Sequence, residues 1–221
     1  MPSNATFKPI NFSLAYNHED PNYNKSNKVI WPPIYLLPFS FSPMPASDQG
    51  VSSDRYTLIP RTLIFLTQGD FILLLKGRPH KRLWANQYNG IGGHIERGED
   101  ILTAARRELK EETALSVDDL WLCGVITVDV GDRPGILIFV LRGELDQDAP
   151  LAESRLVASP EGSLEWVPVS RAYNLPLVED LPALLPRLLA ARRDRTLFFA
   201  HYTYADNGKL VIKFNDSTDF Q

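Results

Sequence analysis

The feature that most constrains the fold is a series of short apolar segments that runs from residue 56 to residue 214. Segments rich in Ile, Leu, Val and Phe are separated by polar turns, a pattern typical of β-strands. We expect strands at residues 57–67, 71–76, 120–130, 135–144, 164–167, 197–204 and 209–214. Two other segments, residues 101–113 and 181–193, have the spacing of amphipathic helices.

The order of these segments predicts a mixed sheet flanked by helices. Turn sequences at residues 68–70 and 206–208 separate the first two and the last two strands, so each pair is expected to form a hairpin. Residues 135–144 are apolar for most of their length, which favours a central, buried strand. Strands and helices alternate without a strict β-α-β rhythm, so we expect an α/β protein of the α+β type.

Length and composition exclude several classes of protein. A chain of 221 residues with 44% hydrophobic and 23% charged residues is typical of a globular protein, not of a coiled coil or a collagen. Its net charge of −4 argues against binding to nucleic acid polymers. The apolar runs are too short to cross a membrane, and the N-terminus does not resemble a secretory signal. The single cysteine, Cys123, favours a cytoplasmic location.

The first part of the chain differs in composition from the rest. Residues 1–43 contain six asparagines, seven prolines and no arginine, whereas residues 44–221 contain all fifteen arginines. Frequent prolines interrupt helices and central strands. We therefore expect residues 1–55 to form an irregular or disordered N-terminal extension and residues 56–221 to form the folded domain. The extension is either loosely attached or a lid or dimer arm, and Met44 is a second candidate start. The oligomeric state stays open.

A glycine-rich loop precedes the first predicted helix. Gly90, Gly92 and Gly93 give the backbone a freedom that allows close approach to a ligand. Asp100 follows as the expected N-cap of the helix at residues 101–113. The sequence therefore indicates a loop that leads directly into a capped helix.

Three glutamates share one face of that helix. Glu108, Glu111 and Glu112 are three and four positions apart, and like charges at this spacing repel each other by roughly 0.2–0.5 kcal/mol per pair. A hard divalent cation such as Mg²⁺ would account for the cluster, because it prefers oxygen ligands. The alternative is a solvated acidic face that is paired with nearby basic residues.

The same segment resembles the signature of a known family. Gly93, five residues, Glu99, seven residues and then residues 107–115 are similar to the Nudix hydrolase motif, Gly-x5-Glu-x7-Arg-Glu-U-x-Glu-Glu-x-Gly-U, in which U is apolar. Every fixed position matches except one, because Ala114 stands where the family has glycine. Weaker similarity extends over residues 56–214.

The resemblance implies an α/β/α sandwich and the metal-dependent hydrolysis of a nucleoside diphosphate linked to another group. It implies that Arg107 orients a glutamate and that Glu99 braces the loop. It also implies a set of ligands for Mg²⁺ or Mn²⁺: a carbonyl of Gly92 or Gly93, and the side chains of Glu108, Glu111 and Glu112. Phosphoanhydrides resist attack because their oxygens are negative, and a bound divalent ion neutralises them.

A narrower resemblance concerns the base of the nucleotide. Family members that clear oxidised purine triphosphates have an asparagine and an acidic pair that read the base, and Asn89 and the pair Glu179 and Asp180 stand at similar positions. This resemblance implies hydrolysis of an oxidised purine triphosphate to monophosphate and pyrophosphate. ADP-ribose or a dinucleotide is the alternative substrate, and a non-catalytic nucleotide sensor is the alternative class.

Other residues near the motif have two open interpretations each. Lys76 and Arg78 end a predicted strand and are either contacts for the triphosphate tail or exposed cations. Trp84 and Tyr88 either stack on a base or pack in the core. His94 is either a base or phosphate contact or a positioning group.

Overall fold

The computed structural model describes residue 50 and residues 55–80, 82–131, 133–149, 151, 161–193 and 197–215. The expectations for residues 1–49, including the one for Met44, lie outside these ranges. Among the described residues, no helix is both long enough and apolar enough to span a bilayer.

The elements follow the predicted order closely. Along the chain they are β1 (Leu58–Gln68), β2 (Phe71–Gly77), β3 (Tyr88–Asn89), α1 (Ile101–Thr113), β4 (Leu120–Val128), β5 (Gly135–Leu145), β6 (Gly162–Pro168), α2 (Val169–Ala172), α3 (Leu181–Ala190), β7 (Phe198–Tyr204) and β8 (Leu210–Asn215). The two short elements β3 and α2 were not predicted, because neither is long enough to show a hydrophobic period.

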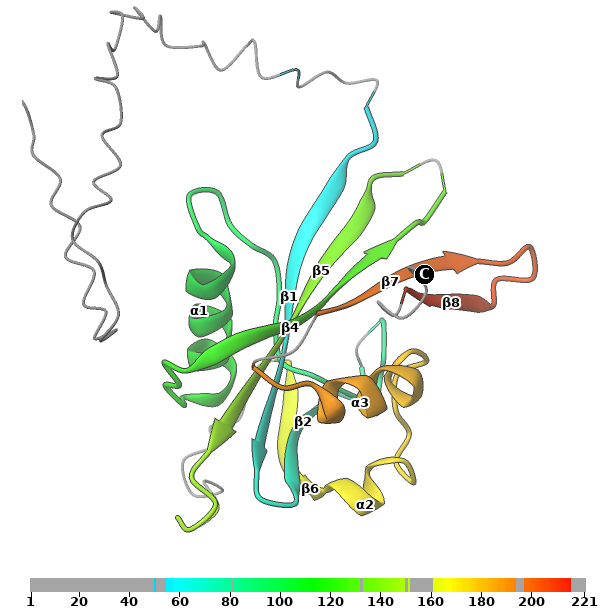
Figure 1. The fold of residues 1–221 in the computed structure, drawn as a ribbon. Coiled ribbons are helices and arrows are strands. Elements are labelled where there is room, and N and C mark those ends of the chain that lie inside the picture. Colours follow the sequence, from blue (N-terminus) through cyan, green and yellow to red (C-terminus); the bar gives the residue numbers. More distant parts are fainter. Residues whose placement is uncertain are drawn as a thin grey trace, which may run out of the picture. The chain divides into compact units, whose positions relative to one another are not determined.

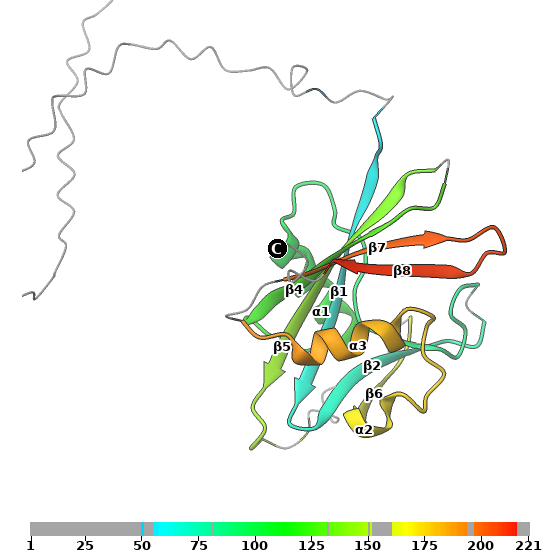
Figure 2. The same ribbon diagram turned by 45° about the vertical axis from the view of Figure 1, so that its right-hand side comes forward.

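The strands form one mixed sheet. Within the described residues its order is β3-β2-β1-β5-β4-β7-β8, and β6 also pairs with β2. β1 and β5 run parallel, as do β4 and β7, whereas both predicted hairpins are antiparallel. α1 covers one face of the sheet, and α2 and α3 lie on the other (Figures 1 and 2). The expected α+β sandwich with a central β5 is therefore confirmed.

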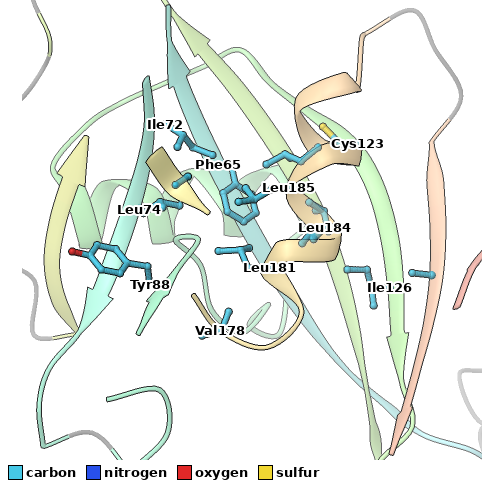
Figure 3. Close-up of a cluster of buried hydrophobic side chains, with 14 of the residues drawn as sticks. Phe65, Ile72, Leu74, Tyr88, Cys123, Ile126, Val178, Leu181, Leu184 and Leu185 are labelled. Carbon is cyan, nitrogen blue, oxygen red and sulfur yellow. The ribbon is translucent and has the colours of Figure 1, made fainter. Parts of the chain in front are cut away.

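Alternate residues of β1 pack into two separate hydrophobic cores. Ile64 and Leu66 are buried with Leu109 of α1 on one face of the sheet. Phe65 points to the opposite face, where it is buried with Leu184 of α3 (Figure 3). Because side chains alternate along a strand, β1 holds both helices in place.

Helix α1 begins as its sequence predicts. The Asp100 side chain caps the helix, since its Oδ1 accepts hydrogen bonds from the backbone N–H groups of Leu102 and Thr103 at 2.8 and 2.9 Å. At the other end Ala114 adopts a left-handed conformation with φ of 61°, and its N–H donates to the carbonyl of Lys110 at 2.9 Å. The glycine of the family signature suits this conformation, because it lacks a Cβ.

Replacing the C-cap residue, Ala114→Gly, is expected to stabilise the protein by about 1 kcal/mol, because a left-handed conformation costs an L-residue roughly 1–2 kcal/mol. Urea unfolding should show a higher midpoint with an unchanged slope. Gly208→Ala is the matched control of opposite sign, since Gly208 has a φ of 77° and open space around its missing Cβ. An unchanged midpoint for Ala114→Gly would show that the left-handed conformation of Ala114 does not destabilise the protein.

Helix α3 ends three residues before its predicted boundary at residue 193. The prediction was wrong here because the end of the helix is set by a distant side chain. The guanidinium of Arg142, in β5, lies within 3.0–3.3 Å of three carbonyl oxygens at this end, those of Leu188, Leu189 and Ala191. Carbonyls that a longer helix would bond internally are satisfied by this arginine instead.

Candidate active site

The glycine loop is fastened to the edge of β1 by its backbone. The N–H of Thr62 donates to the carbonyl of Gly93 at 2.9 Å, and Ile64 and Ile91 exchange two backbone hydrogen bonds. A Cβ on Gly92 would lie 2.3 Å from the carbonyl oxygen of Thr62, and its φ is 141°. Glycine is therefore required at this position for the loop to lie against the strand.

Two of the three glutamates of α1 lie against this loop. A Cβ on Gly93 would lie 2.6 Å from Oε1 of Glu108, and the N–H of Gly92 donates to Oε2 of Glu112 at 3.4 Å. Glu112 is buried, and the Glu108 side chain is 14% exposed, whereas the Glu111 side chain is 60% exposed. Glu108 and Glu112 therefore do not belong to a solvated acidic face.

Arg107 joins the helix to the loop before it. Its Nε and Nη2 donate to the two carboxylate oxygens of Glu99 at 2.7 and 2.9 Å, and Nη2 also donates to the carbonyl of His94 at 3.0 Å. The two bonds that Arg107 donates to Glu99, with one from the N–H of Glu96, lower the pKa of Glu99 to about 2. Glu99 thus remains ionised, and the pair braces the loop.

The same guanidinium contacts two of the glutamates. Nη1 of Arg107 donates to Glu108 at 2.8 Å and to Glu111 at 3.3 Å. In the described part of the chain, no three acidic, histidine or cysteine side chains are grouped closely enough to hold a metal ion as they stand. Arg107 therefore balances the negative charge of this face, and a cation would compete with it for Glu108 and Glu111.

The residues around the loop nevertheless fit a hard divalent cation. Glu108 and Glu112 bring carboxylate oxygens to the loop backbone, and oxygen donors are the ligands of Mg²⁺. The carbonyl of Gly93 already accepts a hydrogen bond from Thr62. Of the two glycine carbonyls considered, that of Gly92 is therefore the better candidate ligand.

A cavity of about 130 Å³ opens on the side of the loop that faces α3. Asn89 and Asp180 both line it, although they are far apart in the sequence. Burial, together with the nearby carboxylate of Glu179, raises the pKa of Asp180. A neutral carboxyl group can both donate and accept a hydrogen bond, so the side of the cavity formed by Asp180 can recognise a polar heterocycle.

A second cavity of about 70 Å³ adjoins the first. The two share the residues Trp84, Asn89, Gly90 and Gly92, and the second is also lined by Glu112. The two cavities therefore lie side by side, with Glu112 of α1 in the lining of one and Asp180 in the lining of the other.

Glu179 does not line the cavity. It is exposed, and its Oε1 accepts a hydrogen bond from the N–H of Leu210 at 3.2 Å. The turn before α3 points the two carboxyl groups in different directions, so only Asp180 lines the cavity.

The two aromatic residues have different roles. Tyr88 is 4% exposed, and its hydroxyl donates to Glu165 at 2.7 Å, so it belongs to the core. Trp84 is 47% exposed, has a φ of 59° and lines both cavities. The amino group of Lys76 lies over the Tyr88 ring, and Arg78 is exposed; neither lines the two cavities.

Four residues that line the larger cavity were not singled out from the sequence, and one of them is Thr62. Leu63 and Ile138 are apolar strand residues that resemble any core residue. Arg61 had a detectable signal, because it is the only charged residue in the predicted strand at residues 57–67.

Comparisons with known proteins point to one family. A sequence model of the NUDIX domain matches residues 57–188. A zebrafish (Danio rerio) protein described as an oxidized purine nucleoside triphosphate hydrolase is 32% identical over 113 residues, which are 51% of this chain and 70% of the relative. A mouse (Mus musculus) protein of the same description is 26% identical over 151 residues, covering 68% of this chain and 89% of the relative.

The fold has solved counterparts as well. The crystal structure of a MutT protein from Bacillus halodurans superposes with a TM-score of 0.57 at 23% identity, over 72% of this chain and 98% of that one. Since the NUDIX domain match covers more than half of the chain, this protein belongs to the Nudix hydrolase family.

Proposed function

We propose that this protein hydrolyses purine nucleoside triphosphates, with a preference for oxidised purines, to the monophosphate and pyrophosphate. The observation that carries the proposal is the pair of adjoining cavities, one lined by Glu112 of α1, the other by Asp180, and both by Asn89. A nucleotide has the same layout, with a charged phosphate tail at one end and a base at the other. The zebrafish and mouse relatives, whose descriptions name oxidised purine triphosphates, support this choice.

The phosphate tail is assigned to the end that contains Glu112. Glu108, Glu111, Glu112 and the Gly92 carbonyl would hold Mg²⁺ or Mn²⁺, which when bound supplies positive charge for the phosphate oxygens. Arg107 holds Glu108 by a hydrogen bond and fixes the loop through Glu99, so the ligands keep their positions. Lys76 and Arg78 remain candidates for contacts to the distal phosphates.

The base is assigned to the cavity between Asn89 and Asp180. Oδ1 of Asn89 accepts a hydrogen bond from the N–H of Gly90 at 2.8 Å, which orients its amide and leaves the NH₂ group free to donate. The raised pKa of Asp180 favours its protonated form, which donates through its hydroxyl and accepts through its carbonyl. Together they can read the edge of a purine.

Asn89→Ala and Asp180→Ala are expected to lower the ratio of kcat/KM for 8-oxo-dGTP to that for dGTP by about 10-fold or more, because a site built to hydrogen-bond a base loses discrimination when one partner is removed. Hydrolysis itself should persist in both variants, since the glutamates are unchanged. Steady-state kinetics with both nucleotides at saturating Mg²⁺ measure the ratio.

The matched control is Asp206→Ala, which alters an exposed aspartate in the β7–β8 turn and should leave the ratio unchanged. Equal kcat/KM for 8-oxo-dGTP and dGTP in the unmodified protein would refute the preference. A clear preference for ADP-ribose would replace it with the alternative substrate class, without affecting the metal ligands.

A further inference from the structure

Arg61 is a cation on the core-facing side of β1. Leu63 and Phe65, two and four positions further along, pack into the core beneath α3, so the Arg61 side chain projects from the same face. Its Nε is buried, and within the described residues it has no hydrogen-bond partner. Burying a charged donor without a partner is costly, so such a group calls for an explanation.

The surroundings of Arg61 place it at the base end of the site. It pairs with Ile138 across β1 and β5, and both residues line the larger cavity together with Asp180. Arg61 does not line the smaller cavity that contains Glu112. Arg61 therefore lines the cavity that we assign to the base and not the cavity that contains Glu112.

No carboxylate in the part of the chain that the structure describes pairs with Arg61. The partner that the geometry leaves room for is a ligand that brings an acceptor into a largely apolar cavity. Carbonyl oxygens of purines are such acceptors, and arginine is the side chain that most often reads the O6 and N7 edge of guanine.

We propose that Arg61 donates a hydrogen bond to the C6 carbonyl oxygen of the bound purine and so selects 6-oxopurines over 6-aminopurines. This inference rests on the proposed function, because it assumes that a purine occupies the cavity. Arginine has only donors, and the amino group of an adenine also presents donors at C6. An adenine-type base would therefore leave the guanidinium unpaired.

The test compares two oxidised nucleotides, 8-oxo-dGTP with an oxo group at C6 and 8-oxo-dATP with an amino group there. Arg61→Met keeps a long side chain but removes the donors, and should lower kcat/KM for 8-oxo-dGTP by about 10- to 100-fold while changing that for 8-oxo-dATP by less than about 3-fold. Arg61→Lys retains a cationic donor group, so its kcat/KM for 8-oxo-dGTP should lie between that of the unmodified protein and that of Arg61→Met. Arg171→Met, an exposed arginine of α2, is the matched control and should change neither.

A binding measurement separates this inference from the proposed hydrolysis. Calorimetry with 8-oxo-dGMP and 8-oxo-dAMP, in buffer with a chelator, reports on the base cavity without turnover. Selective loss of 8-oxo-dGMP binding in Arg61→Met supports the role of Arg61 even if no triphosphate is hydrolysed. Equal losses for the two bases would indicate a phosphate or ribose contact and overturn the inference, as would unchanged binding. Failure of the unmodified protein to hydrolyse any purine triphosphate would count against the proposed function alone.

Discussion

Replacing Glu111 or Glu112 with glutamine is expected to lower kcat by about 10²-fold or more while the fold is retained. Glutamine keeps the size of the side chain and one carbonyl oxygen, but it removes the negative charge that would anchor a divalent ion. Glu112 tests this most sharply, because it is buried against the N–H of Gly92. Turnover is measured at saturating Mg²⁺, and circular dichroism checks the fold.

Lys110→Gln is the control on the same helix, since Lys110 is exposed and lies between the glutamates in sequence. It should retain activity within about 3-fold, because it contacts neither the loop nor the cavities. If Glu111→Gln and Glu112→Gln both turn over at the rate of the unmodified protein, the glutamates of α1 do not hold the catalytic metal.

Replacing Arg142 with methionine is expected to destabilise the protein by about 3 kcal/mol, the cost typical of breaking a buried charged network. The buried guanidinium caps the C-terminal carbonyls of α3 and donates to Thr67 at 3.3 Å and to Glu144 at 2.7 Å. Methionine fills similar volume but leaves those carbonyls and the Thr67 hydroxyl without a donor. Urea unfolding measures the loss.

Arg193→Met provides the contrast. Both arginines lie over the ring of Trp121, at 5.7 Å for Arg142 and 4.4 Å for Arg193, but Arg193 is half exposed and pairs with the exposed Asp119. Surface ion pairs contribute roughly 0–1 kcal/mol, so Arg193→Met should cost at most about 1 kcal/mol. Similar losses for the two variants would show that stacking on Trp121, and not the capping of α3, stabilises this region.

Elements governed by neighbouring residues could be predicted from the sequence. The start of α1 depends on Asp100, and the turn between β7 and β8 depends on residues 206–208, so both were located correctly. The spacing of the three glutamates also fixed which face of α1 they share, because that face is a property of the helix alone.

Features that depend on distant residues could not be predicted. The end of α3 is set by Arg142, 48 positions before Ala190, and no local pattern marks it. No local pattern brings Asn89 and Asp180 together, and only the family resemblance suggested it; they line one cavity because the fold brings β3 beside the start of α3. Which member of the acidic pair lines the cavity depends on the turn that precedes α3, and a resemblance between sequences does not specify that turn.

Product analysis of one reaction decides whether this fold carries the proposed activity. The purified full-length protein is incubated with 8-oxo-dGTP and Mg²⁺, and ³¹P NMR follows the products alongside parallel reactions with dGTP and ADP-ribose. We expect 8-oxo-dGMP and pyrophosphate, formed with a higher kcat/KM than the products of either competitor. Release of orthophosphate with a nucleoside diphosphate, or faster hydrolysis of ADP-ribose than of 8-oxo-dGTP, would contradict the proposal.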